Sequence, residues 1–298
     1  MVELVKKIDL HVHTRRRNGP VRRNGTNYAT PEQLCAMYDL IGVEKGVILP
    51  SVSPEGHFTL TTNEDILEIV EEKPDRFAWF CNLDPRLAEN CGETDFTSFL
   101  NYYKERGAKG VGEVTCNLDF DDPRVLALFR ACEICEMPVT FHIGHTNGEY
   151  GLMDELHLPR LEKVLQMFPK LKFLGHSTRF WSEIGSDVTE ETRHGWPQGK
   201  VMPGGSVVRL MRQYPNLCGD LSAGSGYHAM TRDPEFAYGF LEEFQDRLYY
   251  GTDICAPENI ELNFLKLGAF LDDAVQNGKI SYEAYWKISR GNALELLK

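Results

Sequence analysis

Short apolar runs recur along the chain at nearly regular intervals. They are rich in Val, Ile, Leu, Phe and Tyr, residues that favour strands. Longer segments with helical spacing of apolar residues separate them, and this alternation is typical of repeated βα units around a parallel sheet. Eight such units close into a (β/α)8 barrel of the α/β class, known as a TIM barrel. The predicted strands cover residues 5–13, 45–50, 77–83, 107–115, 138–144, 171–177, 217–222 and 247–253.

Several segments between these runs begin with residues that stabilise the first turn of a helix. Thr30 and Gln33 fit a capping box, with proline between them at the first helical position. Asn63 is expected to cap the next helix in the same way, and Asp-Pro pairs at 122–123 and 233–234 open two more. We therefore predict helices between the strands.

The length fits one domain. A barrel takes about 250 residues, and the 298 residues here allow modest insertions. Residues 258–298 predict further helices that pack on the outside of the ring. Residues 178–205, rich in Gly, Ser, Thr and Arg, are typical of a lid or binding loop. We predict a single barrel domain over residues 1–298.

Charge and hydropathy then restrict the partners. A net charge of −12 repels phosphate backbones and argues against nucleic acid. No apolar run approaches the roughly 20 residues of a membrane helix, and the first residues lack an export signal. We therefore expect a cytoplasmic protein that binds small molecules, neither a membrane nor nucleic acid. Cys132 and Cys135 form a C-x-x-C within a helix body and are expected to be buried thiols.

Polar side chains stand at the carboxyl-terminal ends of five predicted strands. Because the βα loops of a barrel converge at that end, these groups are expected to form one site. Imidazole and carboxylate groups are ligands that zinc prefers. We therefore predict a site for one or two divalent metal ions, with zinc favoured over manganese. The predicted ligands are His11, His13, Glu113, His142, His176 and Asp253.

His11 and His13 form an H-x-H pattern, and alternation along a strand turns both imidazoles to the same side. Taken alone, the pattern also fits two histidines that are hydrogen-bonded within a core. Glu113 is compatible with three roles, namely bridging two metals, ligating one, or pairing with a nearby cation. The five-strand pattern favours the metal interpretation.

Asp253 and His176 are the predicted catalytic residues. A carboxylate at the end of a strand can ligate a cation and take a proton from the attacking water, although an ordinary helix N-cap fits Asp253 too. His176 is suited to bind a second ion or to donate to the substrate carbonyl and its oxyanion, with a core histidine as the alternative.

Five arginines crowd the loop after the H-x-H pattern of an otherwise acidic chain. Arginine pairs with carboxylate or phosphate through two parallel hydrogen bonds, so the loop predicts a small anionic substrate. A solvated basic loop or a contact between subunits is the alternative. The predicted substrate-binding residues are Arg15, Arg16, Arg17, Arg22, Arg23, His57, His145, Arg179 and Trp181.

Five segments, D-L-H-V-H, G-V-G-E-V, P-V-T-F-H-I-G, L-K-F-L-G-H-S and L-Y-Y-G-T-D-I, together resemble the amidohydrolase superfamily. The resemblance is to its amidohydrolase-2 branch, related to aminocarboxymuconate-semialdehyde decarboxylase. It implies a distorted barrel with one or two divalent metals, often zinc. It also implies a catalytic or second-site role for His176, and ligand roles for His11, His13, His142 and Asp253.

The chain departs from that branch at the fourth strand. Many members lack a metal-contacting acid there, so Glu113 points towards two-metal or glutamate-ligated relatives such as TatD-like hydrolases, and no lysine is present for a carbamylated bridge. The opening I-D-L-H-V-H-T also resembles PHP phosphoesterases, but R-R-R-N-G and I-L-P-S replace the later motifs of that family.

The predicted activity is hydrolysis of an amide, ester or lactone bond in a small anionic molecule. The same ligand set can also serve nonoxidative decarboxylation of a small carboxylic acid. The arginine loop is compatible with a third activity, that of a PHP-like or TatD-like phosphoesterase. A non-catalytic barrel is the alternative from outside the enzymes, and it predicts a purified protein without stoichiometric metal. Such barrels are also compatible with homo-oligomers.

Overall fold

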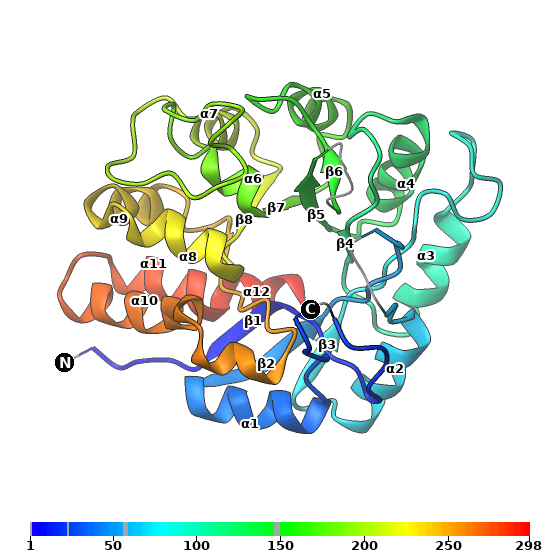
Figure 1. Ribbon diagram of the computed structural model, residues 1–298, viewed down its shortest axis with the longest axis horizontal. Coiled ribbons are helices and arrows are strands. Elements are labelled where there is room, and N and C mark those ends of the chain that lie inside the picture. Colours follow the sequence, from blue (N-terminus) through cyan, green and yellow to red (C-terminus); the bar gives the residue numbers. More distant parts are fainter. Residues whose placement is uncertain (1, 23, 56–58, 146–149) are drawn as a thin grey trace.

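A ring of helices surrounds a parallel sheet in the computed structural model, which describes residues 2–22, 24–55, 59–145 and 150–298 (Figure 1). All strand pairs are parallel, as expected for βα units. The strands are β1 (Lys7–Val12), β2 (Val43–Ile48), β3 (Phe77–Trp79), β4 (Val111–Val114), β5 (Val139–Gly144), β6 (Leu152–Met153), β7 (Phe173–His176), β8 (Leu217–Asp220) and β9 (Leu248–Tyr249). Each predicted strand overlaps one of them, and the two-residue β6 was not predicted.

Two sheets of order β1-β2-β3 and β4-β5-β7-β8-β9 make up the strand layer, with β6 beside β5. Isolated parallel bridges join their edges, Cys81 to Val111 on one side and Val12 to Ile254 on the other. The Leu10 amide also donates to the Tyr250 carbonyl oxygen at 3.0 Å. The (β/α)8 barrel prediction is confirmed, and the carboxyl ends of all eight main strands face one side.

The helix starts follow their capping residues, with two corrections. Thr30 and Gln33 form the predicted capping box, and Asp122 accepts from the Arg124 amide at 2.9 Å. The cap of the second helix is Thr62 rather than Asn63, because the Asn63 amide group instead bonds the backbone of Asn82. Asp233 stands at the start of its helix without capping it, since its carboxylate accepts from the Val201 amide at 3.0 Å.

The α-helices run as α1 (Pro31–Ile41), α2 (Asn63–Glu72), α3 (Thr97–Lys104), α4 (Pro123–Ile134), α5 (Pro159–Met167), α6 (Thr178–Ser182), α7 (Ser206–Gln213), α8 (Ala223–Thr231), α9 (Pro234–Glu243), α10 (Leu267–Gln276), α11 (Tyr282–Trp286) and α12 (Asn292–Leu296). Short turns η1 (Pro257–Glu261), η2 (Asn263–Lys266) and η3 (Lys287–Gly291) connect the last of them. The irregular segment predicted at 178–205 thus begins with α6, and α7 follows it.

The last helix closes the barrel interior at the end opposite the carboxyl ends of the strands. Side chains from β1, β2, β7, β8 and β9 form a small apolar cluster with Ala293 of α12, and Leu296 and Leu297 pack against it. Lys109, just before β4, donates to the Lys298 carbonyl oxygen at 3.1 Å. The C-terminus accordingly lies near the centre of the ring (Figure 1). This position differs from the predicted one outside the ring, because the apolar face of α12 covers inward-facing strand residues.

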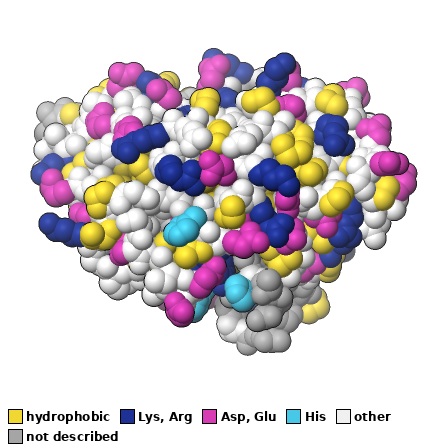
Figure 2. Space-filling view, turned by 90° about the horizontal axis from the view of Figure 1, so that it is seen from above, with side chains coloured by type: hydrophobic (Ala, Val, Ile, Leu, Met, Phe, Trp, Pro, Cys, Tyr) yellow, Lys and Arg dark blue, Asp and Glu magenta, His cyan; other side chains and the backbone are white. Residues whose placement is uncertain are grey.

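The surface carries charges of both signs. Lys and Arg side chains lie among Asp and Glu side chains over the face shown in Figure 2. Cys132 and Cys135 are buried, as expected for thiols within a helix body. Among the described residues, no helix is long and apolar enough to cross a membrane.

Candidate metal centre

Two imidazoles face each other at the carboxyl end of β1. The Nε2 atoms of His11 and His13 are 3.1 Å apart, and both rings are buried. The opposite nitrogen of each ring is engaged, because His11 Nδ1 lies 2.6 Å from a carboxylate oxygen of Asp220 and His13 Nδ1 lies 2.9 Å from the Leu49 carbonyl oxygen. These acceptors favour a proton on each Nδ1, which leaves Nε2 of each ring as the nitrogen available to a cation.

Two carboxylates approach the same point. Glu113 Oε2 and Asp253 Oδ1 each lie 3.7 Å from His11 Nε2 and 3.5 Å from His13 Nε2. In a tetrahedral zinc site with bonds of about 2.0–2.2 Å, neighbouring ligand atoms are about 3.3–3.6 Å apart. The distances of 3.5 and 3.7 Å from each carboxylate to the two imidazoles are close to this spacing and are compatible with a bound divalent cation.

The charges and atom types of these four side chains also suit a metal ion. Two facing lone pairs and two carboxylates repel one another unless a positive charge stands between them. A divalent cation supplies that charge, and its ligands here are the nitrogen and oxygen atoms that zinc prefers. His11, His13, Glu113 and Asp253 are thus the residues that would hold the metal.

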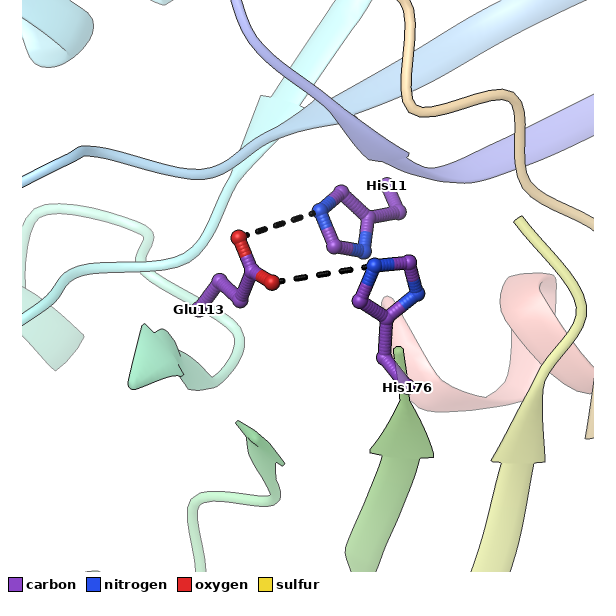
Figure 3. A group of neighbouring side chains, drawn as sticks. All are labelled: His11, Glu113 and His176. Atoms are coloured by element: carbon purple, nitrogen blue, oxygen red, sulfur yellow. Dashed lines mark ion pairs between the residues drawn. The ribbon is translucent and has the colours of Figure 1, made fainter. Parts of the chain in front are cut away.

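His176 and His142 also approach Glu113. Figure 3 shows the Glu113 carboxylate facing the neighbouring rings of His11 and His176, with one oxygen towards each ring. His176 Nε2 is 3.7 Å from Glu113 Oε1, whereas His142 Nδ1 hydrogen-bonds that oxygen at 2.6 Å. Among the described residues, two groups are suited to hold an ion, namely His11 with Glu113 and His176, and His11 with His13 and Asp253. A ligand role for His142, which belongs to neither group, stays a prediction.

Burial and mutual attraction set the charges in this cluster. Burial alone would lower the pKa of His11, but the carboxylates of Asp220 and Glu113 outweigh it and raise the pKa well above the usual value. Burial would raise the pKa of Glu113, but the neighbouring histidines lower it well below its usual value. In the metal-free protein a proton therefore occupies the His11–His13 pair, in the same negative field that attracts a divalent cation.

His176 has the opposite character. Burial and the positive charge of His11 lower the pKa of His176 to about 4. Its Nδ1 lies 3.0 Å from the Ser222 hydroxyl oxygen. His176 is consequently neutral near pH 7 and can donate a hydrogen bond from Nε2 when the Ser222 hydroxyl donates to Nδ1.

Asp220, at the end of β8, is a site residue that the sequence prediction missed. It is fully buried, and its Oδ2 binds His11 Nδ1 and lies 3.5 Å from His176 Nδ1. The signal was present, since Asp220 ends an apolar strand just as Asp253 does. Asp220 orients the histidine ligand and fixes its proton, as carboxylates beside metal-binding histidines commonly do.

Replacement of this carboxylate should weaken metal binding without removing a ligand. In Asp220→Asn, His11 loses its charged acceptor, and we expect metal affinity to fall about 10- to 100-fold. Competition with a chromogenic zinc chelator measures the change. Asn216→Ala serves as the control for a general loss of packing. It removes a buried amide directly before β8, the strand that ends with Asp220. An unchanged affinity in Asp220→Asn would show that Asp220 does not support the ligand.

A cavity of about 210 Å³ opens directly over the cluster. The Asp253 side chain is 28% exposed towards it, whereas that of Glu113 is only 6% exposed. Asp253 has a φ of 54°, a conformation uncommon outside glycine, which turns its carboxylate at the strand end. The lining residues are His13, Arg15, Asn18, Gly19, Pro20, Arg22, Asn27, Tyr28, Thr59, Glu113, Tyr150, Asp253 and Cys255.

The structure separates the predicted substrate-binding arginines. Arg15 and Arg22 line the cavity. Arg16 instead pairs with Glu68 and Glu72 at 3.5 and 3.0 Å, and Arg17 is exposed. Arg23 and His57 lie outside the described residues.

The remaining predicted contacts lie away from this cavity. His145 lines a second cavity, of about 470 Å³, beside Arg160 and Arg193. Arg179 and Trp181 are buried in α6, and the Trp181 indole donates to the Asp220 carbonyl oxygen at 2.8 Å. Trp181 therefore supports the strand end that carries Asp220, and in this structure it does not line the cavity over the metal cluster.

Comparison with known proteins places these features in context. The amidohydrolase family model matches residues 8–298, and no curated protein sequence matches significantly. A zinc-containing amidohydrolase from Burkholderia multivorans is 12% identical, with 98% of each chain covered and a TM-score of 0.63.

Two further solved structures differ in activity. A probable 2-pyrone-4,6-dicarboxylic acid hydrolase from Acinetobacter baumannii, with citric acid bound, is 15% identical over 98% of this chain and 99% of its own, with a TM-score of 0.61. A manganese-containing dihydroxybenzoic acid decarboxylase from a Polaromonas species is 16% identical over 99% of this chain and 97% of its own, with a TM-score of 0.57. At these identities the likeness is one of fold.

Proposed function

Since this chain belongs to the amidohydrolase family, as the match over residues 8–298 shows, we propose that it hydrolyses an amide, ester or lactone bond in a small anionic molecule. The family comprises metal-dependent hydrolases and decarboxylases, and an enzyme of this general kind is expected here. The proposal concerns which bond it cleaves. The observation that carries it is the convergence of His11, His13, Glu113 and Asp253 beneath the cavity.

A divalent cation in this position would polarise a carbonyl oxygen and lower the pKa of a coordinated water. Asp253 is the residue suited to accept the proton of the attacking water, because it is the most exposed carboxylate of the cluster and borders the cavity. Its Oδ2 lies 3.9 Å from His176 Nε2. The carboxylate can hold a proton there and return it to the leaving group.

His176 contributes a hydrogen bond to the oxygen on which negative charge develops. Its low pKa keeps the ring neutral, and its Nε2 lies 3.7 Å from Glu113 Oε1 and 3.9 Å from Asp253 Oδ2, two carboxylates that line the cavity. Donors fixed in advance at such an oxygen lower the barrier because they need no reorganisation during the reaction.

The charge of the cavity favours an anionic substrate. One divalent cation offsets the two carboxylates, Glu113 and Asp253. Arg15 and Arg22 then remain as the charged groups among the residues that line the cavity. The cavity volume of about 210 Å³ is below the roughly 300–1,000 Å³ of drug-sized sites, which indicates a small molecule.

Assays that distinguish the bond cleaved test the proposal. The zinc-loaded and manganese-loaded protein is incubated with small carboxylated lactones, aryl esters and anilides, with hydroxybenzoates, and with aryl phosphates. We expect one new carboxylate per turnover from the first group, read by titration of the released proton. Release of carbon dioxide from hydroxybenzoates or of phosphate from aryl phosphates, with no ester, amide or lactone cleaved, would instead assign decarboxylation or phosphoester hydrolysis.

A further inference from the structure

Arg15 is a half-buried cation in the wall of the cavity. Its Nη1 atom is shielded from solvent and makes no hydrogen bond within the described part of the chain. Leaving such a donor unsatisfied costs about 1–3 kcal/mol, more when the group is charged. A side chain held in this way, beside a cavity over a metal cluster, is suited to an acceptor that arrives with a ligand.

Gly19 and Thr59 shape the space in which this guanidinium lies. A Cβ atom built at Gly19 would overlap Arg15 Nη1 and would lie 2.6 Å from Thr59 Oγ1. The Thr59 hydroxyl is itself buried with no hydrogen-bond partner in the described ranges. Arg15 Nη1 and Thr59 Oγ1, both without a hydrogen-bond partner among the described residues, therefore border the space beside Gly19 that a Cβ atom would fill.

Arg22, the other arginine of the cavity wall, is already engaged. Its Nη2 donates to the Cys255 carbonyl oxygen at 3.1 Å and its Nη1 to the Cys255 sulfur at 3.3 Å. Its guanidinium also stacks 4.4 Å from the centre of the Tyr28 ring. Arg22 is thus fixed as part of the wall, whereas Arg15 Nη1 has no hydrogen-bond acceptor among the described residues.

We propose that Arg15 binds a carboxylate of the substrate that is distinct from the scissile carbonyl, and that Gly19 positions Arg15 for this contact. The inference rests on the proposed function only in taking the cavity as the substrate site. A carboxylate bound there would give the Arg15 N–H groups a charged acceptor and would lie near the Thr59 hydroxyl. The substrate class is therefore a small acid whose carboxylate reaches Arg15 while another polar group faces the metal cluster.

Two ligands of the same shape test this proposal without turnover. Isophthalate carries two carboxylates, and 3-carbamoylbenzoate replaces one of them by an uncharged amide. Calorimetric titration of the zinc-loaded protein measures both affinities, and elemental analysis records the metal content. We expect the wild type to prefer isophthalate at least about tenfold, since a charge-assisted pair is lost with the amide.

The variants assign that preference to particular residues. Arg15→Gln should bind both ligands about equally with an unchanged metal content. Gly19→Ala should behave similarly, because its Cβ displaces Arg15 while the backbone of Gly19 lies outside the left-handed region. Arg16→Gln is the matched control, since Arg16 pairs with Glu68 and Glu72 away from the cavity.

Three results would overturn parts of the proposal. A wild type without preference for isophthalate removes the second carboxylate from the substrate class. If Arg15→Gln still prefers isophthalate, Arg15 does not bind the second carboxylate. If Gly19→Ala still prefers it, Gly19 does not position Arg15. None of these results depends on which bond is cleaved, so a protein that releases carbon dioxide would still show the preference.

Discussion

Replacement of both His11 and His13 by alanine should leave less than about a tenth of the wild-type metal and lower turnover on the order of 10⁴-fold or more. The two Nε2 atoms are the centre towards which both carboxylates point, at 3.5 to 3.7 Å. Without them, neither of the two groups suited to hold an ion is complete, because both include His11. Elemental analysis after purification without added ions, beside assays at saturating zinc, measures both effects.

The double variant needs a control for folding, because His11 is buried against the Asp220 carboxylate. His13→Ala alone leaves the His11–Asp220 pair intact and, outside the metal cluster, removes the contact to the Leu49 carbonyl oxygen. It should fold and still lose most of the metal. His157→Ala, at a histidine whose side chain is 64% exposed, should retain it. If the wild type itself purifies and reconstitutes without metal, the chain is a non-catalytic barrel.

The strand ends were predictable from the sequence because a parallel barrel gathers them on one side. His11, His13, Glu113 and Asp253 lie far apart in the chain, yet each follows an apolar run of strand length. The closure of eight βα units then fixes where they meet, without any knowledge of the loops. That rule also covers Asp220, which ends an apolar run in the same way but was not among the predicted residues.

Side-chain pairing within the site could not be predicted from these patterns. Alternation places His11 and His13 on one side, but the pairing of β1 with β2 shifts register between Asp9 and Val12. Asp9 bonds Tyr38 of α1 and Thr252, whereas Ile8 and Leu10 join the inner cluster, and the shift follows directly after Asp9. A local shift of this kind depends on neighbouring strands and leaves no periodic signal.

The arginine loop illustrates the same limit. Five arginines in one loop are equivalent by composition, yet Arg15 and Arg22 line the cavity while Arg16 reaches Glu68 and Glu72 on α2. Arg15 Nη1 occupies space that a Cβ atom at Gly19 would fill, a feature that the composition of the loop does not reveal. The loop has no repeated spacing that would show which side chains point towards the cavity. Only the folded structure therefore distinguishes its arginines.

Asp253→Asn should lower kcat about 10²- to 10⁴-fold while most of the metal remains. The amide keeps the shape of the side chain and an oxygen that can face the cation, but it cannot accept the proton of the attacking water. His11, His13 and Glu113 still surround the ion position, at 3.1 to 3.7 Å from one another. Steady-state kinetics on the substrate identified by the assays above, with metal content determined in the same samples, measures the change.

The role of Asp253 as a ligand and its role as a proton acceptor give different results at saturating metal. If Asp253 only holds the ion, added zinc restores the activity of Asp253→Asn, because mass action compensates for weaker binding. If it moves the proton, the loss of kcat persists when every site is filled. Asp246→Asn, at a side chain that is 72% exposed and paired with Lys287, controls for the removal of one negative charge. Full activity in metal-replete Asp253→Asn would therefore transfer the proton-accepting role to another group.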